Sequence, residues 1–180
     1  MKYFTPELYL QFNSADDGEA DRADGAWEEA LGSYERHLES FRNDLPVRVK
    51  QLADERCFHD AEVLSLQEGE SEPIFLRSPV PILLPIVIVT LKQEDQVVVV
   101  VYLLWGRVRH VQPAEEWKLS PQRRHWLYDE VDLDPRGPGL YWQRVLLSDG
   151  AMIEIPFVDV FFQTLPIDSV AAAPARRKRA

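Results

Sequence analysis

Hydrophobic residues in the first third of the chain recur at helical spacing. One stripe, with intervals of 4, 3, 4, 3 and 4 residues, consists of Trp27, Leu31, Tyr34, Leu38, Phe41 and Leu45. This period predicts an amphipathic helix of about five turns. Thr5 followed by Pro6 predicts a short helix before it, because Thr caps helix N-termini and Pro at the first position leaves no N–H unpaired. Pro46 predicts a further helix that runs to about Glu55, and the acidic stretch 16–24 is expected to be a loop or the frayed start of the long helix.

Extended segments replace the helical period from Cys57 onward. In chain order we expect a strand at 57–66, a turn at 68–71 and a short strand at 74–77. A hairpin of 85–92 with 96–105 follows. The continuous β-branched runs of this hairpin indicate strands that are covered on both faces. Helices would cover one face, and later strands that curl over the sheet, or a second subunit, would cover the other.

The last third of the chain predicts a helical turn and more strands. The turn is expected at 113–117, a strand at 125–133, and a hairpin of 140–147 with 151–157. Asp149-Gly150 favours a two-residue type I′ turn between the hairpin strands. In that register Trp142, Arg144 and Leu146 would share a face with Phe157, Ile155 and Ile153, respectively. Residues 158–162 are compatible with either strand or helix.

This order of elements predicts an α+β fold in which N-terminal amphipathic helices pack on a mainly antiparallel sheet of about six or seven strands. The 180 residues, 46% of them hydrophobic, are enough for one domain with a sizeable core. We expect a single domain over 1–168, helical over 1–56 and sheet over 57–168, followed by a basic tail at 169–180. A single Cys excludes an intramolecular disulfide framework and suits a reducing compartment.

Charge is distributed unevenly along this acidic chain. The formal net charge is -10, and residues 1–72 hold 18 acidic and 7 basic side chains, a net of -11. Such a chain lacks the broad basic surface of a nucleic-acid-binding protein. The most apolar run, 79–91, is shorter than the roughly 20 residues of a membrane-spanning helix. The N-terminus lacks the features of a secretory signal. We therefore expect a cytoplasmic protein that binds neither nucleic acid nor membrane.

Motifs for catalysis are absent from the sequence. It has no phosphate loop, no nucleophile elbow and no pair of histidines four residues apart. We therefore predict no enzymatic activity, no cofactor and no metal. If 57–66 is a strand, Cys57 and His59 lie about 7 Å apart on one face, which favours a buried Cys beside a hydrogen-bonded core His. As an alternative, His59 and Asp60 could begin a metal site with His110, His125 or Asp129, provided that a bulge brings them to one side.

An acidic group follows two aromatic residues near the middle of the predicted sheet. Asp129, Glu130 and Asp132 come directly after Trp126 and Tyr128. One interpretation is a solvated strand end, and the other is a contact surface for a basic partner with the aromatic rings as anchors. Arg144 would lie on the apolar face of the last hairpin, where its charge needs a carboxylate partner inside the fold.

Several segments resemble known bacterial proteins. Residues 58–64, Phe-His-Asp-Ala-Glu-Val-Leu, resemble the "F-H-D-A-x-V" segment of small bacterial α+β proteins, among them some immunity proteins of polymorphic toxin systems. Residues 1–7, 126–131, 145–150 and 153–157 look like an uncharacterised bacterial family with this layout. The resemblance implies a non-enzymatic cytoplasmic protein and assigns no catalytic residue.

Three functions follow as hypotheses. The first is a protein-binding module of the immunity or inhibitor kind, for which negative charge would speed the encounter with a basic partner. The second is a self-associating accessory domain, a homodimer, suggested by the unbroken valine run 97–101. The third is a metal-assisted hydrolase that uses His59 and Asp60.

Overall fold

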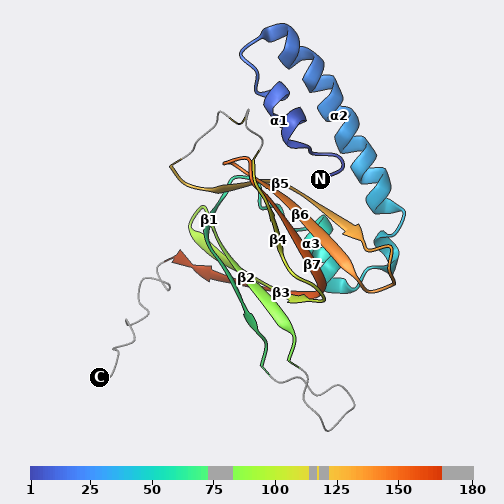
Figure 1. The fold of residues 1–180 in the computed structure, drawn as a ribbon, viewed down its shortest axis with the longest axis vertical. Helices are drawn as coiled ribbons and strands as arrows, with labels where there is room; N and C mark the ends of the chain where they lie inside the picture. The colour runs from blue at the N-terminus through green and yellow to red at the C-terminus, as the bar shows by residue number, and fades with distance from the viewer. Residues whose placement is uncertain (73–82, 114–116, 118–121, 168–180) are drawn as a thin grey trace.

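In the part of the chain that the structure describes, three α-helices and a 3₁₀ turn precede seven strands (Figure 1). The computed structural model describes residues 1–72, 83–113, 117 and 122–167. The helical elements are α1 (Pro6–Phe12), α2 (Asp17–Glu39), the 3₁₀ turn η1 (Arg42–Asp44) and α3 (Val47–Asp54). The strands are β1 (Ala61–Glu70), β2 (Pro85–Gln93), β3 (Gln96–Leu104), β4 (Arg109–Val111), β5 (His125–Leu133), β6 (Tyr141–Leu147) and β7 (Met152–Pro166). The α+β class with an antiparallel sheet is therefore confirmed.

The first two helices begin at side-chain caps. Thr5 Oγ1 accepts a hydrogen bond from Leu8 N at 3.2 Å, as the sequence predicts for α1. Asp16 Oδ1 accepts from Glu19 N at 2.8 Å, so the acidic stretch after it belongs to α2.

The predicted C-terminus of the long helix is wrong. Helix α2 ends at Glu39, and the stripe residues Phe41 and Leu45 flank η1 instead. Both side chains are nevertheless buried, because they pack into the hydrophobic core. Leu31, from the middle of the same stripe, is 46% exposed. The hydrophobic period therefore identified α2 correctly, but two of its buried positions lie outside the helix.

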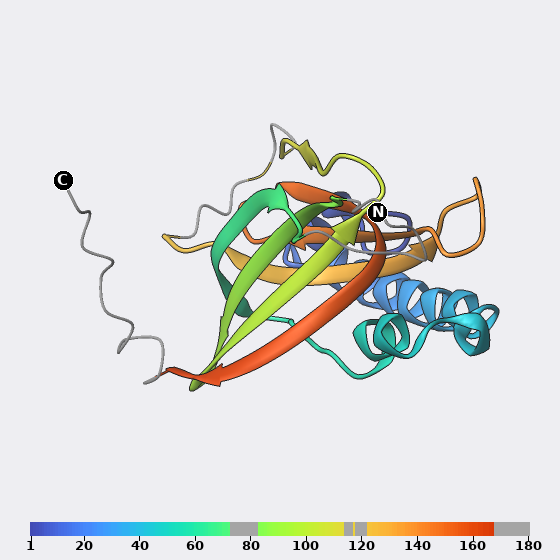
Figure 2. The ribbon, with the colours of Figure 1, turned by 90° about the horizontal axis from the view of Figure 1, so that it is seen from below.

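Six strands close into a barrel in the order β3-β2-β1-β5-β6-β7 (Figure 2). Closure depends on β7, whose first half pairs with β6 and whose second half pairs with β3. A register shift opposite Leu103 and Leu104 lets β7 bend from one partner to the next. Strand β4 adds to the first half of β7 outside the barrel. Later strands thus cover the open face of the β2–β3 hairpin, which is one of the two arrangements expected.

Alternate residues of the strands fill the barrel. Val87, Val89 and Leu91 of β2 and Val100 of β3 are fully buried, and α3 joins the same core through Leu52 and its neighbours. The outward positions of the β2–β3 hairpin are partly exposed. The expected burial of both hairpin faces is therefore wrong for the outer face. In the described part of the chain, no helix has the length and apolar character needed to cross a membrane.

The register of the β6–β7 hairpin differs by one residue from the prediction. Arg144 lies opposite Glu154, and Leu147 N donates to Ala151 O at 2.9 Å. The turn therefore contains three residues and ends at Gly150, whose φ of 80° suits the last position of such a turn. A one-residue slip reverses the faces, so Arg144 is on the outside of the barrel and not beside Ile155.

The start of the sheet also differs from the prediction. A turn closed by a hydrogen bond from Ala61 N to Phe58 O at 2.9 Å precedes β1, so residues 57–60 are not strand. Strand β1 continues to Glu70, which overturns the predicted turn at 68–71. The predicted strand at 74–77 and the basic tail at 169–180 lie outside the described residues, as does most of the predicted helical turn at 113–117. Residues 158–162, which had been left open, are strand.

Candidate functional site

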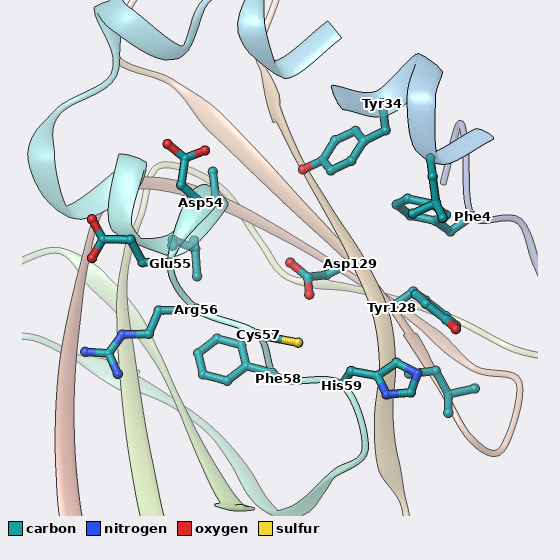
Figure 3. Close-up of a pocket in the computed structure, with 14 residues that line it drawn as sticks. Phe4, Tyr34, Asp54, Glu55, Arg56, Cys57, Phe58, His59, Tyr128 and Asp129 are labelled. Carbon is teal, nitrogen blue, oxygen red and sulfur yellow. The ribbon is translucent and has the colours of Figure 1, made fainter. Parts of the chain in front are cut away.

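A cleft of about 430 Å³ opens between α2, the connection from α3 to β1, and β5 (Figure 3). Its wall includes apolar side chains from all three elements, among them Leu31, Leu52, Phe58 and Leu127. Polar groups stand among them, and Figure 3 shows the side chains of Tyr34, Cys57 and Asp129 directed toward the same space. A concave, largely apolar site with a few polar groups is typical of ligand pockets, and its volume lies within their usual range.

Three aromatic rings form one side of the cleft. The ring centroid of Phe4 lies 5.4 Å from that of Tyr34 and 5.6 Å from that of Tyr128. Tyr34 is fixed by Val131 N, which donates to its hydroxyl oxygen at 2.7 Å. Burial raises the pKa of the Tyr34 hydroxyl, with a further contribution from the charge of Asp129. This side of the cleft is thus a rigid surface of π faces beside a neutral hydroxyl.

Glu130 holds Phe4 in this position. Its carboxylate accepts from Lys2 N, Tyr3 N and Phe4 N at distances between 2.6 and 3.1 Å. The side chain is 1% exposed. The expectation of a solvated strand end is therefore wrong for Glu130, and its carboxylate is inaccessible to a partner. The N-terminal segment binds it instead, and the aromatic side of the cleft depends on this contact.

Asp129 lies in the wall of the cleft at the end of a polar chain through the barrel. Trp126 Nε1 donates to its Oδ1 at 2.8 Å, and Gln143 Nε2 donates to its Oδ2 at 2.7 Å. Gln143 Oε1 in turn accepts from the Tyr102 hydroxyl at 2.5 Å. Burial raises the pKa of Asp129 and Glu130 adds to this, whereas the two donors act in the opposite direction. The carboxyl group is only partly exposed, through the cleft.

Cys57 and His59 line the cleft just before β1, and Asp60 follows them in the chain. Cys57 is exposed, so its expected burial is wrong. His59 is also accessible, with Nδ1 3.1 Å from Asp60 Oδ2 and its ring 4.8 Å from that of Tyr128. Asp60 has a φ of 63°, and the side chains of His59 and Asp60 contact each other across this turn.

The remaining predicted site residues are used inside the fold. Trp126 is 1% exposed and therefore cannot anchor a partner. Asp132 Oδ1 lies 2.9 Å from His37 Nε2, and its Oδ2 lies 3.3 Å from Arg144 Nη1. Arg144 Nε is also 3.5 Å from Glu154 Oε1, so Arg144 has the carboxylate partners that were expected, although on the outer face.

The described residues do not bring the suspected metal ligands together. No group of three or more His, Cys, Asp or Glu side chains in this part of the chain could hold a metal ion. His110 Nε2 lies 3.8 Å from Glu68 Oε1, and His125 is in β5 opposite Glu62. His59 and Asp60 thus contact each other without either of the histidines proposed to join them.

An acidic stripe runs along the outer face of α2. It is made of exposed carboxylates at intervals of 4, 3, 4, 7 and 4 residues, namely Asp17, Asp21, Asp24, Glu28, Glu35 and Glu39. These intervals place the six side chains on one side of the helix. Within the described part of the chain, none of the six forms an ion pair. Leu31, on the cleft wall, borders the stripe between Glu28 and Glu35.

Comparisons with protein-family models and with curated proteins found no match to this chain.

Proposed function

We propose that this protein is a non-enzymatic binding module that associates with a basic protein through the acidic stripe of α2, in the manner of immunity and inhibitor proteins. The observation that carries the proposal is the stripe itself. Six exposed carboxylates on one face of a 23-residue helix have no cation partner among the described residues. Like charges on neighbouring turns destabilise a helix slightly, and a basic partner would relieve that repulsion.

The position of the stripe also supports the proposal. Opposite potentials on two proteins increase the rate of encounter and select against acidic partners. The cleft beside Leu31 would give the same face a concave feature into which a side chain of the partner could insert. The segment at residues 58–64 supports the class of protein through its resemblance to immunity proteins.

Affinity capture with matched charge variants tests this proposal. The bait is the tagged full chain, incubated with a lysate of the cells that naturally produce it. The stripe variant changes four residues of α2 to Lys, namely Asp24, Glu28, Glu35 and Glu39. The control variant also changes four residues to Lys, namely Glu70, Glu72, Glu94 and Asp95, which are equally exposed but lie outside α2. Circular dichroism establishes that both variants fold.

The proposal predicts one stoichiometric basic protein that the wild type and the control retain and the stripe variant loses. Capture that is equal for all three baits, or a captured protein that is acidic, would contradict it.

Self-association is a second candidate, favoured by the outer face of the β2–β3–β7 region. Ile88, Val99 and Val101 are partly exposed there, and Phe161 opposite Val101 is 39% exposed. Apolar side chains in one exposed patch mark interfaces. Light scattering across a hundredfold range of concentration, with Phe161→Glu as the comparison, would reveal a dimer that the substitution weakens. A monomer at every concentration would exclude this candidate.

A further inference from the structure

The carboxyl group of Asp129 lacks a counter-ion in the described part of the chain. The basic side chains of the cleft have other partners. Arg56 Cζ lies 5.1 Å from the centroid of the Phe162 ring, and Figure 3 shows it directed away from the cleft. His59 contacts Asp60, and no described arginine, lysine or histidine forms an ion pair with Asp129. Buried charges in proteins are normally paired.

The two hydrogen bonds to Asp129 leave part of its capacity unused. A carboxylate offers about four acceptor positions, and Trp126 and Gln143 occupy one on each oxygen. Both are neutral donors. They orient the carboxylate without compensating its charge, and the Asp129 side chain lines the cleft (Figure 3).

The surroundings of Asp129 favour an organic cation over a metal ion. Divalent metals such as Ca²⁺ need about six oxygen ligands or more, and the described residues contain no group of three acidic or metal-binding side chains that could supply them. The partly exposed rings of Tyr34 and Tyr128 instead offer π faces and apolar contact. Aromatic rings around a carboxylate are suited to ammonium and guanidinium groups.

We propose that this cleft binds an organic cation, an ammonium or guanidinium group whose charge lies against the carboxylate of Asp129 and whose carbon chain contacts Tyr128. The cation has two possible sources that share this chemistry. It is either a free small amine or a lysine or arginine side chain of a protein partner. The second source rests on the proposed function, because the neighbouring stripe residues Glu28 and Glu35 would meet the basic surface around that side chain.

Calorimetric and NMR titrations of the full chain test this inference with three probes. Benzylammonium is the free amine, benzyl alcohol is its neutral counterpart, and the peptide acetyl-Gly-Arg-Gly-amide represents a partner side chain. The titrated proteins are the wild type, Asp129→Asn, and the control Glu55→Gln, which removes a carboxylate from the same cleft wall. The fold can accommodate Asn at position 129. The Gln143 amide rotates so that its oxygen accepts from the Asn NH₂ group, and its own NH₂ group then donates to the Tyr102 hydroxyl.

Benzylammonium is expected to bind the wild type about tenfold or more tightly than benzyl alcohol, since a charged hydrogen bond is worth at least that factor. Asp129→Asn should lose about the same factor and Glu55→Gln less than about twofold. The indole N–H resonance of Trp126 should shift with the cations, because it donates to the carboxylate that they contact. Binding of the peptide assigns the site to a partner side chain, and binding of benzylammonium alone assigns it to a free amine.

A chemical block gives a test that does not depend on the Asp129 variant. The Cys57 thiol is exposed in the cleft, so its reaction with N-ethylmaleimide should obstruct the site and abolish cation binding. Equal affinity for benzylammonium and benzyl alcohol, cation binding that survives Asp129→Asn, or no binding to the wild type would overturn the inference. These results are separable from the proposed function. The stripe variant should lose the protein partner while it still binds benzylammonium.

Discussion

Replacement of Glu130 by Gln should destabilise the protein strongly and release its N-terminal segment. Three backbone N–H groups converge on the Glu130 carboxylate, with the shortest N–O distance 2.6 Å, to Tyr3. A hydrogen bond to a charged group contributes about 1.5–3 kcal/mol. Gln keeps one acceptor oxygen but presents an NH₂ group where an acceptor is needed. We therefore expect the loss of about one such bond, that from Lys2 N to Oε2, or roughly 1.5–3 kcal/mol of the free energy of unfolding.

The cost is limited because the segment can detach into water. Detachment exposes Phe4, which is 3% exposed in the intact fold, and burial of such a side chain stabilises by about 1.5–3 kcal/mol. Loss of hydrogen bonding within the fold and detachment of the segment thus lower the free energy of unfolding by similar amounts. Urea unfolding followed by circular dichroism measures the change, and hydrogen exchange at the amides of Tyr3 and Phe4 locates it.

Glu62→Gln is the matched control for this prediction. Glu62 Oε2 lies 2.9 Å from Arg123 Nη1, and the Arg123 side chain is 65% exposed. The ion pair is therefore solvated and contributes less than about 1 kcal/mol to the free energy of unfolding. If Glu130→Gln cost no more than this control, and if exchange at Tyr3 and Phe4 stayed slow, the role assigned to Glu130 would be refuted.

Three further predictions concern the cleft and the last hairpin. Burial raises the pKa of Asp129 above its usual 3.8, so the folded state binds its proton more tightly and stability should fall as the pH rises through the native pKa. Asp129→Asn should flatten this part of the pH profile in urea unfolding, and an unchanged profile would contradict the prediction. Gly150→Ala should cost about 2 kcal/mol or more, since φ is 80° there and a Cβ would overlap the Trp117 indole; a loss below about 0.5 kcal/mol in thermal unfolding would contradict this. Cys57, exposed in the cleft, should react completely with Ellman's reagent in the native protein, and reaction only after unfolding would show that it is covered.

Local patterns were sufficient to predict most of the elements. The helical period identified α2, Thr5-Pro6 identified the start of α1, and the β-branched runs identified the β2–β3 hairpin. These signals depend on residues within a few positions of one another. The hairpin around Gly150 shows their limit, because Asp-Gly occurs in both two-residue and three-residue turns. The three-residue turn shifts the pairing of β6 with β7 by one residue from the register that a two-residue turn would give.

Barrel closure and the cleft depend on long-range contacts that no local pattern reports. Pairing of β7 with β3 joins residues that are about 60 positions apart in the chain, such as Val101 and Phe161. Asp129 and Glu130 were recognised as a group, yet adjacent strand positions face opposite sides. Asp129 therefore lines the cleft and bonds to Gln143, whereas Glu130 meets the N-terminal segment. The contribution of Phe4 to the cleft could not be predicted, because it depends on Glu130.

The dependence of association on the α2 stripe can be measured most directly once the captured partner has been purified. Stopped-flow association rates are compared for the wild type, the stripe variant and the control variant at several salt concentrations. If the stripe steers a basic partner, the wild-type and control rates should fall steeply with added salt, and the stripe variant should associate about tenfold or more slowly at low salt. Rates that are equal for the three proteins and independent of salt would contradict binding through this face.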